Sequence, residues 1–293
     1  MFEGFERRQI KTAGATINVL QGGKGPPVLL LHGYPQTHVM WHKIAPRLAN
    51  DFSLVLPDLR GYGDSSKPPD GEDHFGYSKR ATAQDQVEVM EQLGFKQFAV
   101  VGHDRGGRVA HRMALDHPER VTKLAVLDIA PTHKLYHNVS KAFATAYYHW
   151  FFLIQPAPMP ETLISNSAEF YLNSLLGIGR LKPHAITPEA FAEYLRCFRD
   201  PATIHATCED YRAAASIDLV HDEADMDRKV TCPVLALWGE KGVMHRMYDV
   251  VAVWCERAVK VGGKALPCGH FLAEEAPEET LTELKIFLKD TEA

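Results

Sequence analysis

The segment that most constrains the fold is a polar residue held between glycines, where an apolar run meets a helix-like stretch. The apolar run 98–101 is followed by the sequence GHDRGGR, residues 102–108. Glycines on both sides of Asp104 allow a tight, strained strand-to-helix turn, the nucleophile elbow, which presents one side chain at the edge of a sheet. Asp104 occupies the serine position of the G-x-S-x-G form of this turn. The segment therefore predicts an α/β fold with a reactive carboxylate at the sheet edge.

A carboxylate in this position is suited to displacing a leaving group from saturated carbon. A serine would be left as an ether that water does not readily cleave, whereas a carboxylate is left as an ester that water hydrolyses. Asp104 is therefore predicted to be the nucleophile of an alkylation and hydrolysis sequence. The alternative is that Asp104 only caps the following helix, a role that Asp often fills.

Composition limits the kinds of partner. With 293 residues, 45% of them hydrophobic, the chain can build one large α/β domain with an insertion. No apolar run reaches the ~18 residues of a membrane span, and the charged N-terminal segment lacks the apolar core of a secretory signal. A net charge of −5 without a basic run argues against nucleic acid. We expect a cytoplasmic protein with free cysteines and a small-molecule partner, without membrane or nucleic-acid partners.

The strand and helix pattern alternates on both sides of a long helical block. Several strands are continuous apolar runs, which is typical of a parallel sheet buried on both faces. Strands are predicted at residues 16–20, 28–32, 53–58, 98–101, 123–128, 233–239 and 258–266, and helices at 40–48, 78–93 and 278–289. Between them the block 131–221 is rich in aromatic and helix-forming residues. It predicts a helical cap domain (131–221) that closes a site built on a core domain (1–130 and 222–293).

One loop at the carboxyl edge of the predicted sheet carries a candidate backbone donor. The loop 32–35 (HGYP) follows a buried strand, and its glycine would let the backbone N–H of Tyr34 point inward. Together with the N–H of Arg105 it could form an oxyanion hole. The alternative for this loop is an ordinary turn between a strand and a helix.

The remaining catalytic groups are predicted from chain order. Asp128 ends a buried strand on the same edge as Asp104, where it could orient a histidine, or it could only form a turn before Pro131. His270 lies in a Gly-His loop after the last predicted strand. The order nucleophile, acid and histidine is that of the α/β-hydrolases. We therefore assign the base to His270.

Two histidine pairs have the i,i+4 spacing of metal ligands, His38 with His42 and His133 with His137. No Glu or Cys accompanies either pair in a metalloprotease or zinc pattern. We expect both pairs to be surface residues, and we predict no metal and no cofactor.

At this point the motifs match a known family. Over essentially its whole length the chain resembles the fluoroacetate (haloacetate) dehalogenases of the α/β-hydrolase superfamily. The matching stretches are HGYPQ (32–36), GHDRGGR (102–108), VLDI (126–129), YHW (148–150), DYR (210–212) and GHF (269–271). The Asp-Arg-Gly-Gly-Arg cluster with His-Trp in the cap is the most specific of these features.

The resemblance implies a fold, a reaction and a set of site residues. It implies an α/β-hydrolase fold with an inserted helical cap, a homodimer, and conversion of haloacetates to glycolate and halide through an ester on the nucleophile. Its implied residues are catalytic Asp104, Asp128 and His270, carboxylate-binding Arg105 and Arg108, and halide-binding His149, Trp150 and Tyr211. Two guanidiniums three residues apart on one helix face suit a carboxylate, and a departing halide needs preorganised donors. The plainer alternatives are surface ion pairs for the arginines and cap core packing for the aromatic residues.

One departure from the family concerns the cap. Several relatives present a further cap tryptophan toward the substrate, but the matching stretch 175–180 (LLGIGR) has none, with Ile178 and Gly179 at its centre. A smaller residue there predicts a wider pocket and an altered preference for substrate size.

Two other functions remain open on the sequence alone. An epoxide hydrolase would use the same Asp, His and acid groups, but it would be expected to carry Trp after the nucleophile and two cap tyrosines. Arg105 argues against it, because an epoxide offers no anion. A sensor that binds a carboxylate without turnover is disfavoured by the intact nucleophile, acid and base.

Overall fold

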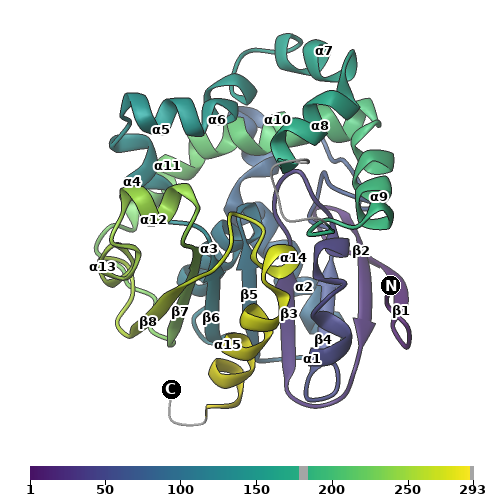
Figure 1. Ribbon diagram of the computed structural model, residues 1–293, viewed down its shortest axis with the longest axis vertical. Coiled ribbons are helices and arrows are strands. Elements are labelled where there is room, and N and C mark those ends of the chain that lie inside the picture. The colour runs from purple at the N-terminus through teal and green to yellow at the C-terminus, as the bar shows by residue number, and fades with distance from the viewer. Residues whose placement is uncertain (178–183, 291–293) are drawn as a thin grey trace.

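The computed structural model describes residues 1–177 and 184–290 and contains an eight-stranded sheet at its centre (Figure 1). The strands pair in the order β1-β2-β4-β3-β5-β6-β7-β8. Their bounds are β1 Glu6–Lys11, β2 Thr16–Gly22, β3 Pro27–Leu31, β4 Ser53–Pro57, β5 Phe98–His103, β6 Val121–Leu127, β7 Val234–Gly239 and β8 Val261–Leu266. The pairs β1–β2 and β2–β4 are antiparallel, and all others are parallel. The parallel strands therefore end at one edge of the sheet.

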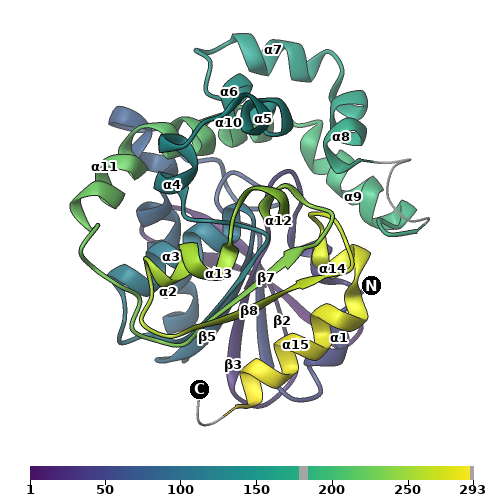
Figure 2. The same cartoon turned by 60° about the vertical axis from the view of Figure 1, so that its left-hand side comes forward.

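Helices cover both faces of this sheet. Figure 2 shows α2 and α3 on one side and α1 and α15 on the other. The helical segments of this part are η1 His38–Trp41, α1 Ala45–Leu48, η2 Glu72–Tyr77, α2 Lys79–Gln92, α3 Arg105–Asp116, α12 Val243–Met247, α13 Val250–Cys255, α14 Leu272–Glu275 and α15 Pro277–Lys289. The predicted start of α2 is confirmed, because the Ser78 side chain accepts a hydrogen bond from Ala81 N. The arrangement confirms the predicted α/β-hydrolase fold class.

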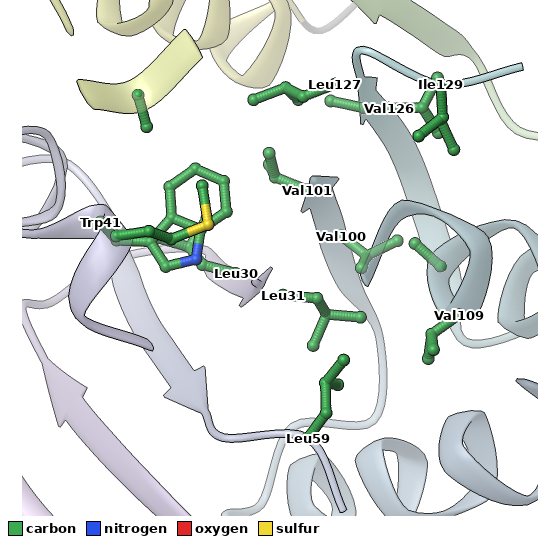
Figure 3. Packing of buried hydrophobic residues seen from close by; sticks show 14 of the residues in the cluster. Leu30, Leu31, Trp41, Leu59, Val100, Val101, Val109, Val126, Leu127 and Ile129 are labelled. Carbon is green, nitrogen blue, oxygen red and sulfur yellow. The ribbon is translucent and has the colours of Figure 1, made fainter. Parts of the chain in front are cut away.

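The core lies between the central strands and these helices. The side chains of β5 are all buried, because both faces of the strand are covered. Figure 3 shows Val100 directed toward Val109 of α3, with Trp41 on the opposite side of the strands. Alternate residues of one strand thus pack into two layers, which holds the end of β5 rigidly.

An insertion of short helices between β6 and β7 lies over the carboxyl ends of the strands (Figure 1). Its helices are α4 Thr132–His137, α5 Lys141–Ala146, α6 Tyr148–Leu153, α7 Met159–Ser165, α8 Ala168–Leu176, α9 Pro188–Phe198, α10 Pro201–Ala215 and α11 Ile217–Ala224. The helical character predicted for this block is therefore found. Its independence as a domain with bounds 131–221 stays a prediction.

Two predicted elements are wrong in detail. The strand expected first is the second, because residues 6–11 form an edge strand whose mostly exposed side chains carry no apolar signal. The helix expected at residues 40–48 is split into η1 and α1. Thr37 caps the first piece, and Pro46, which lacks an N–H, lies in the first turn of the second. Among the helices described, none is long and apolar enough to cross a membrane.

Candidate active site

The elbow between β5 and α3 has the predicted strained geometry. Asp104 adopts φ +46° and ψ −115°, a conformation that L residues rarely occupy. A Cβ on Gly102 would lie 2.4 Å from the carbonyl oxygen of Gly106, and one on Gly106 would lie 2.3 Å from that of His32. Both glycines are therefore required for the turn. The helix-cap interpretation is wrong, because the Asp104 side chain makes no capping hydrogen bond to α3.

The loop after β3 holds one oxygen of the Asp104 carboxylate. The backbone N–H of Tyr34 donates to Asp104 Oδ1 at 3.0 Å. Gly33 allows this approach, because a Cβ there would lie 2.5 Å from Asp104 Cβ. Arg105, whose N–H is the other predicted oxyanion donor, is the first residue of α3. The loop is thus more than an ordinary turn, although its role as an oxyanion hole stays a prediction.

The fold brings Asp104, Asp128 and His270 together from three separate segments. His270 Nδ1 lies 2.5 Å from Asp128 Oδ2, and His270 Nε2 lies 3.9 Å from Asp104 Oδ2. The second oxygen of Asp128 accepts from Gly239 N at 3.0 Å. A carboxylate can only accept, so Nδ1 carries a proton, and Nε2 faces Asp104.

Charges in the site separate the pKa values of these groups. Burial would raise the pKa of Asp104, but His270, His103, Arg108 and Arg105 together lower it below its usual value. Burial would lower the pKa of His270, but the hydrogen bond to Asp128 and the charges of Asp128 and Asp104 raise it above its usual value. Asp104 is therefore ionised at neutral pH, as a nucleophile requires.

Sequence reasoning did not identify His103 as part of this arrangement. Its ring is fully buried, lies 4.6 Å from the His270 ring centroid, and its Nε2 is 2.8 Å from the carbonyl oxygen of His270. Burial lowers the pKa of His103 to about 3, so the ring is neutral and Nε2–H donates to that carbonyl. The signal available in the sequence was its position directly before the nucleophile. His103 fixes the loop that carries His270.

Arg105 and Arg108 lie behind the nucleophile, both buried, so the alternative of surface ion pairs is wrong for them. Arg105 Nε donates to Asp210 Oδ2 at 2.7 Å, and its Nη2 donates to the Asp210 carbonyl at 2.7 Å. Arg108 Nη1 donates to Ala130 O at 2.9 Å and to Thr132 Oγ1 at 3.0 Å. Arg105 Nη1 and Arg108 Nε have no partner among residues 1–177 and 184–290. Each guanidinium thus keeps one free buried nitrogen.

The three predicted halide-binding residues come from α6 and α10 and surround the same region. Trp150 and Tyr211 are fully buried, and within the described chain neither the Trp150 Nε1–H nor the Tyr211 hydroxyl has a partner. The Arg105 guanidinium lies 4.1 Å from the Tyr211 ring centroid, and the Arg108 guanidinium lies 4.7 Å from that of Trp150. Burial lowers the pKa of His149 to about 4, so its ring is neutral. The arginines and the cap aromatic residues therefore form one packed group.

A cavity of about 230 Å³ opens onto Asp104 between the sheet edge and the insertion. Of the predicted residues, its wall includes Tyr34, Asp104, Asp128, His149, Tyr211 and His270. Arg105, Arg108 and Trp150 are not among the described lining residues. Arg105 and Trp150 contact the Tyr211 ring, and Arg108 lies over the Trp150 ring. Lys241 and Arg246, which the sequence did not suggest, line the cavity and are exposed. Leu175 lines it too, but Ile178 and Gly179 lie outside the described residues, so the prediction of a wider pocket stays untested.

One histidine expected at the surface is buried instead. His38 is 1% exposed, and its Nδ1 lies 2.7 Å from Asp58 Oδ1. His42 is half-buried and bonds the carbonyl of Val39. The two side chains therefore pack within the protein and form hydrogen bonds there. The sequence could not show the contact between His38 and Asp58, because Asp58 follows β4 and lies 20 residues further along the chain.

The comparisons with known proteins agree with this geometry. The model of the alpha/beta hydrolase fold family matches residues 26–277. A fluoroacetate dehalogenase from a Burkholderia species is 49% identical over 99% of this chain and 96% of that protein. A soluble epoxide hydrolase from Corynebacterium sp. (strain C12) is 35% identical over 94% of both. Among solved structures, an alpha/beta hydrolase from Nostoc sp PCC 7120 is 63% identical, covers 99% of both chains and gives a TM-score of 0.96.

These likenesses extend over almost the whole chain, including the elbow, the insertion and the histidine loop. The chain therefore belongs to the α/β-hydrolase family and, within it, to the fluoroacetate dehalogenases.

Proposed function

We propose that this hydrolase cleaves the carbon–halogen bond of haloacetates and releases glycolate and halide through an ester on Asp104. The observation that carries the proposal is the set of four buried donors without partners in the described chain: Arg105 Nη1, Arg108 Nε, Trp150 Nε1 and Tyr211 Oη. A buried donor left unpaired costs about 1–3 kcal/mol, so a group of them beside a nucleophile indicates a ligand that pairs with them. Two belong to cations and suit a carboxylate; two belong to the cap and suit a halide.

The first step is displacement of the halide. Asp104 Oδ1 is held by the Tyr34 N–H, so the free Oδ2 is the attacking oxygen. As the C–O bond forms and the C–X bond breaks, negative charge moves to the halide. The N–H and O–H groups of His149, Trp150 and Tyr211 stabilise that charge. Burial keeps the pKa of Tyr211 well above its usual value, so its hydroxyl stays a donor.

The second step is hydrolysis of the ester. His270 Nε2 takes a proton from water, and Asp128 stabilises the imidazolium that forms. The water oxygen adds to the Asp104 carboxyl carbon, and the oxyanion is held by the N–H groups of Tyr34 and Arg105. As the intermediate collapses, the imidazolium of His270 returns its proton to the departing alkoxide oxygen, which releases glycolate. Asp104 gives up the second proton of the water to solvent and is again a carboxylate, with one oxygen from water.

Epoxide hydrolysis is the second candidate, because two tyrosines of the insertion, Tyr147 and Tyr211, line the cavity and could act as ring-opening acids. The relative from Corynebacterium sp. (strain C12) supports this alternative. The buried cations argue against it, since an epoxide carries no anion. A sensor without turnover would not need the Asp128–His270 pair.

The test combines analysis of the reaction products with isotope labelling of the protein. Ion chromatography with fluoroacetate and chloroacetate should detect halide and glycolate, whereas an epoxide should give no diol. A single turnover in heavy-oxygen water should place the label in Asp104. If all label appears in the product and none in the protein, water attacks directly and the proposal is wrong.

We further propose that the protein is a cytoplasmic homodimer whose only substrate partner is a small haloacid. Size-exclusion chromatography with light scattering tests the dimer.

A further inference from the structure

Three side chains that can bind metal lie together at the surface, where the first and last helices of the insertion meet. His133 and His137 belong to α4, Glu223 belongs to α11, and these two helices pack against each other (Figure 1). One donor atom from each side chain lies within 4.8 Å of the others. The acidic residue that the sequence pattern around this histidine pair lacked is thus supplied by a distant segment.

The two imidazoles stack on each other, with ring centroids 3.8 Å apart and ring planes 18° apart, so one ring must rotate before both Nε2 atoms can face one ion. His137 Nδ1 lies 2.9 Å from the carbonyl oxygen of His133, which can only accept, so Nδ1 carries the proton and Nε2 keeps its lone pair. The Nε2 atoms of His137 and His133 lie 3.7 and 3.9 Å from the same oxygen, Glu223 Oε1. Neither Nε2 has a hydrogen-bond partner among residues 1–177 and 184–290, because both distances are too long for a hydrogen bond. Three donors therefore converge without satisfying one another.

These distances fit a tetrahedral divalent cation once one of the two stacked rings has rotated. Metal–nitrogen and metal–oxygen bonds of about 2.0–2.2 Å place neighbouring zinc ligands about 3.3 Å apart. Imidazoles four residues apart on one helix, joined by a carboxylate, form a two-nitrogen, one-oxygen donor set that suits Zn²⁺ and leaves a position for water. We propose that His133, His137 and Glu223 form a zinc site that ties α4 to α11.

A second cluster, Asp70 with His205 and Glu209, does not carry the same inference. Arg212 Nη1 donates to Glu209 Oε1 at 2.6 Å, and the two ring nitrogens of His205 face the carboxylates of Glu161 and Asp70 at 3.1 and 3.2 Å. A cation there would have to displace a guanidinium. Among the described residues, no Lys or Arg side chain is paired with the Glu223 carboxylate. The nearby Lys134 is paired with Glu256 at 2.9 Å, and Arg257 donates to the carbonyl oxygens of Met226 and Asp225.

The zinc site would act on stability rather than on chemistry. None of its three residues is among the described residues that line the cavity above Asp104. An ion that binds only the folded state stabilises it by RT ln(1 + [L]/Kd). We therefore expect zinc to raise the melting temperature without changing the rate of halide release. This inference does not depend on the proposed substrate.

The test measures zinc binding to the full chain after removal of metal with EDTA. Equilibrium dialysis with ZnCl₂ should give one saturable site, and zinc should raise the melting temperature. His137→Ala and Glu223→Gln should each weaken binding by at least about tenfold, as expected for loss of a metal ligand. Glu256→Gln, which removes a neighbouring surface carboxylate outside the site, should bind zinc as the unaltered chain does.

Cobalt substitution identifies the ligands, because five free cysteines offer competing sites. Co²⁺ should give visible bands typical of a tetrahedral nitrogen and oxygen site, and His137→Ala should remove them. A thiolate charge-transfer band, absence of saturable zinc binding, or equal zinc affinity in the unaltered chain and His137→Ala would each overturn the proposal.

Discussion

Two sides of the candidate site differ in how their polar groups are satisfied. The catalytic side, formed by Asp104, Asp128 and His270, is hydrogen-bonded within the protein through Tyr34 N, Gly239 N and the Asp128–His270 pair. The recognition side, formed by Arg105, Arg108, Trp150 and Tyr211, keeps four buried donors without partners in the described chain. The protein itself thus holds the catalytic side chains in place, whereas the recognition side chains keep donors that can bond to a ligand.

This difference predicts which of the two sides lowers the free energy of unfolding of the protein. A satisfied network orients its members and adds to rigidity, whereas unpaired buried donors lower stability until a ligand arrives. Substitutions on the catalytic side should therefore affect rate far more than substrate affinity. Those on the recognition side should trade activity against stability.

The largest effect is expected at the nucleophile. Asp104→Ala removes the carboxylate proposed to form the ester, so halide release should fall by about 10⁴-fold or more. Rate assays with fluoroacetate measure this, and circular dichroism checks folding. Substantial residual turnover would show that another group attacks the substrate.

The next effect separates the two chemical steps. His270→Asn removes the base but leaves Asp104 free to attack, so one halide per chain should be released in a burst and steady turnover should fall by about 10³-fold or more. Peptide mass spectrometry should find the ester on Asp104. An adduct on any other residue would contradict the assignment.

A third test addresses the carboxylate-binding cations. In Arg108→Lys the new side chain has a single nitrogen. It cannot both bond to Ala130 O and Thr132 Oγ1 and offer a further donor to the substrate. KM for fluoroacetate should rise about tenfold to a hundredfold, because a hydrogen bond to a charged group contributes about 1.5–3 kcal/mol. Arg112→Lys, on the same helix but paired with Asp222 and Asp225, is the control and should lower stability without raising KM. An unchanged KM in Arg108→Lys would remove Arg108 from the site.

A comparison of Tyr211 with Tyr194 tests whether activity and stability change in opposite directions. Tyr211→Phe removes an unpaired hydroxyl, so fluoride release should slow by about tenfold to a hundredfold while unfolding free energy rises by about 1 kcal/mol. Tyr194 Oη donates to Glu274 Oε1 at 3.0 Å, so Tyr194→Phe should lower unfolding free energy and leave the ratio of fluoride to chloride release unchanged. Thermal denaturation and halide assays check both. If both variants lose stability equally, the distinction between the two sides fails.

The smallest effect is a shift in pH dependence. The pKa of His270 is raised in the free enzyme, first by Asp128 and further by the charge of Asp104, against the effect of burial. Esterification neutralises Asp104, so the pKa that governs ester hydrolysis should lie below that of free His270. Hydrolysis should accelerate as pH rises through this lower value. NMR titration of His270 and single-turnover rates give the two pKa values, and coincidence of the two would contradict the coupling.

Much of the catalytic side was predictable because its signals are local. Glycines around Asp104 report a turn that only glycine permits, Asp128 directly follows the buried end of β6, and His270 lies in the Gly-His loop after β8. The elements that sequence reasoning misplaced lack such signals, as in the exposed edge strand β1 and the split segment 38–48. The partners of Arg105 were not predictable either, since Asp210 lies on α10 of the insertion.

By itself the sequence determined the fold class and predicted a nucleophile, an acid and a base, because glycine positions, apolar runs and chain order can be read from the sequence alone. Only the tertiary structure decided which donors remain unpaired, that Arg105 shares its guanidinium with Asp210, and that Glu223 joins His133 and His137. Pairing depends on distances between segments remote in the chain, and those distances arise only when the sheet and the insertion pack together.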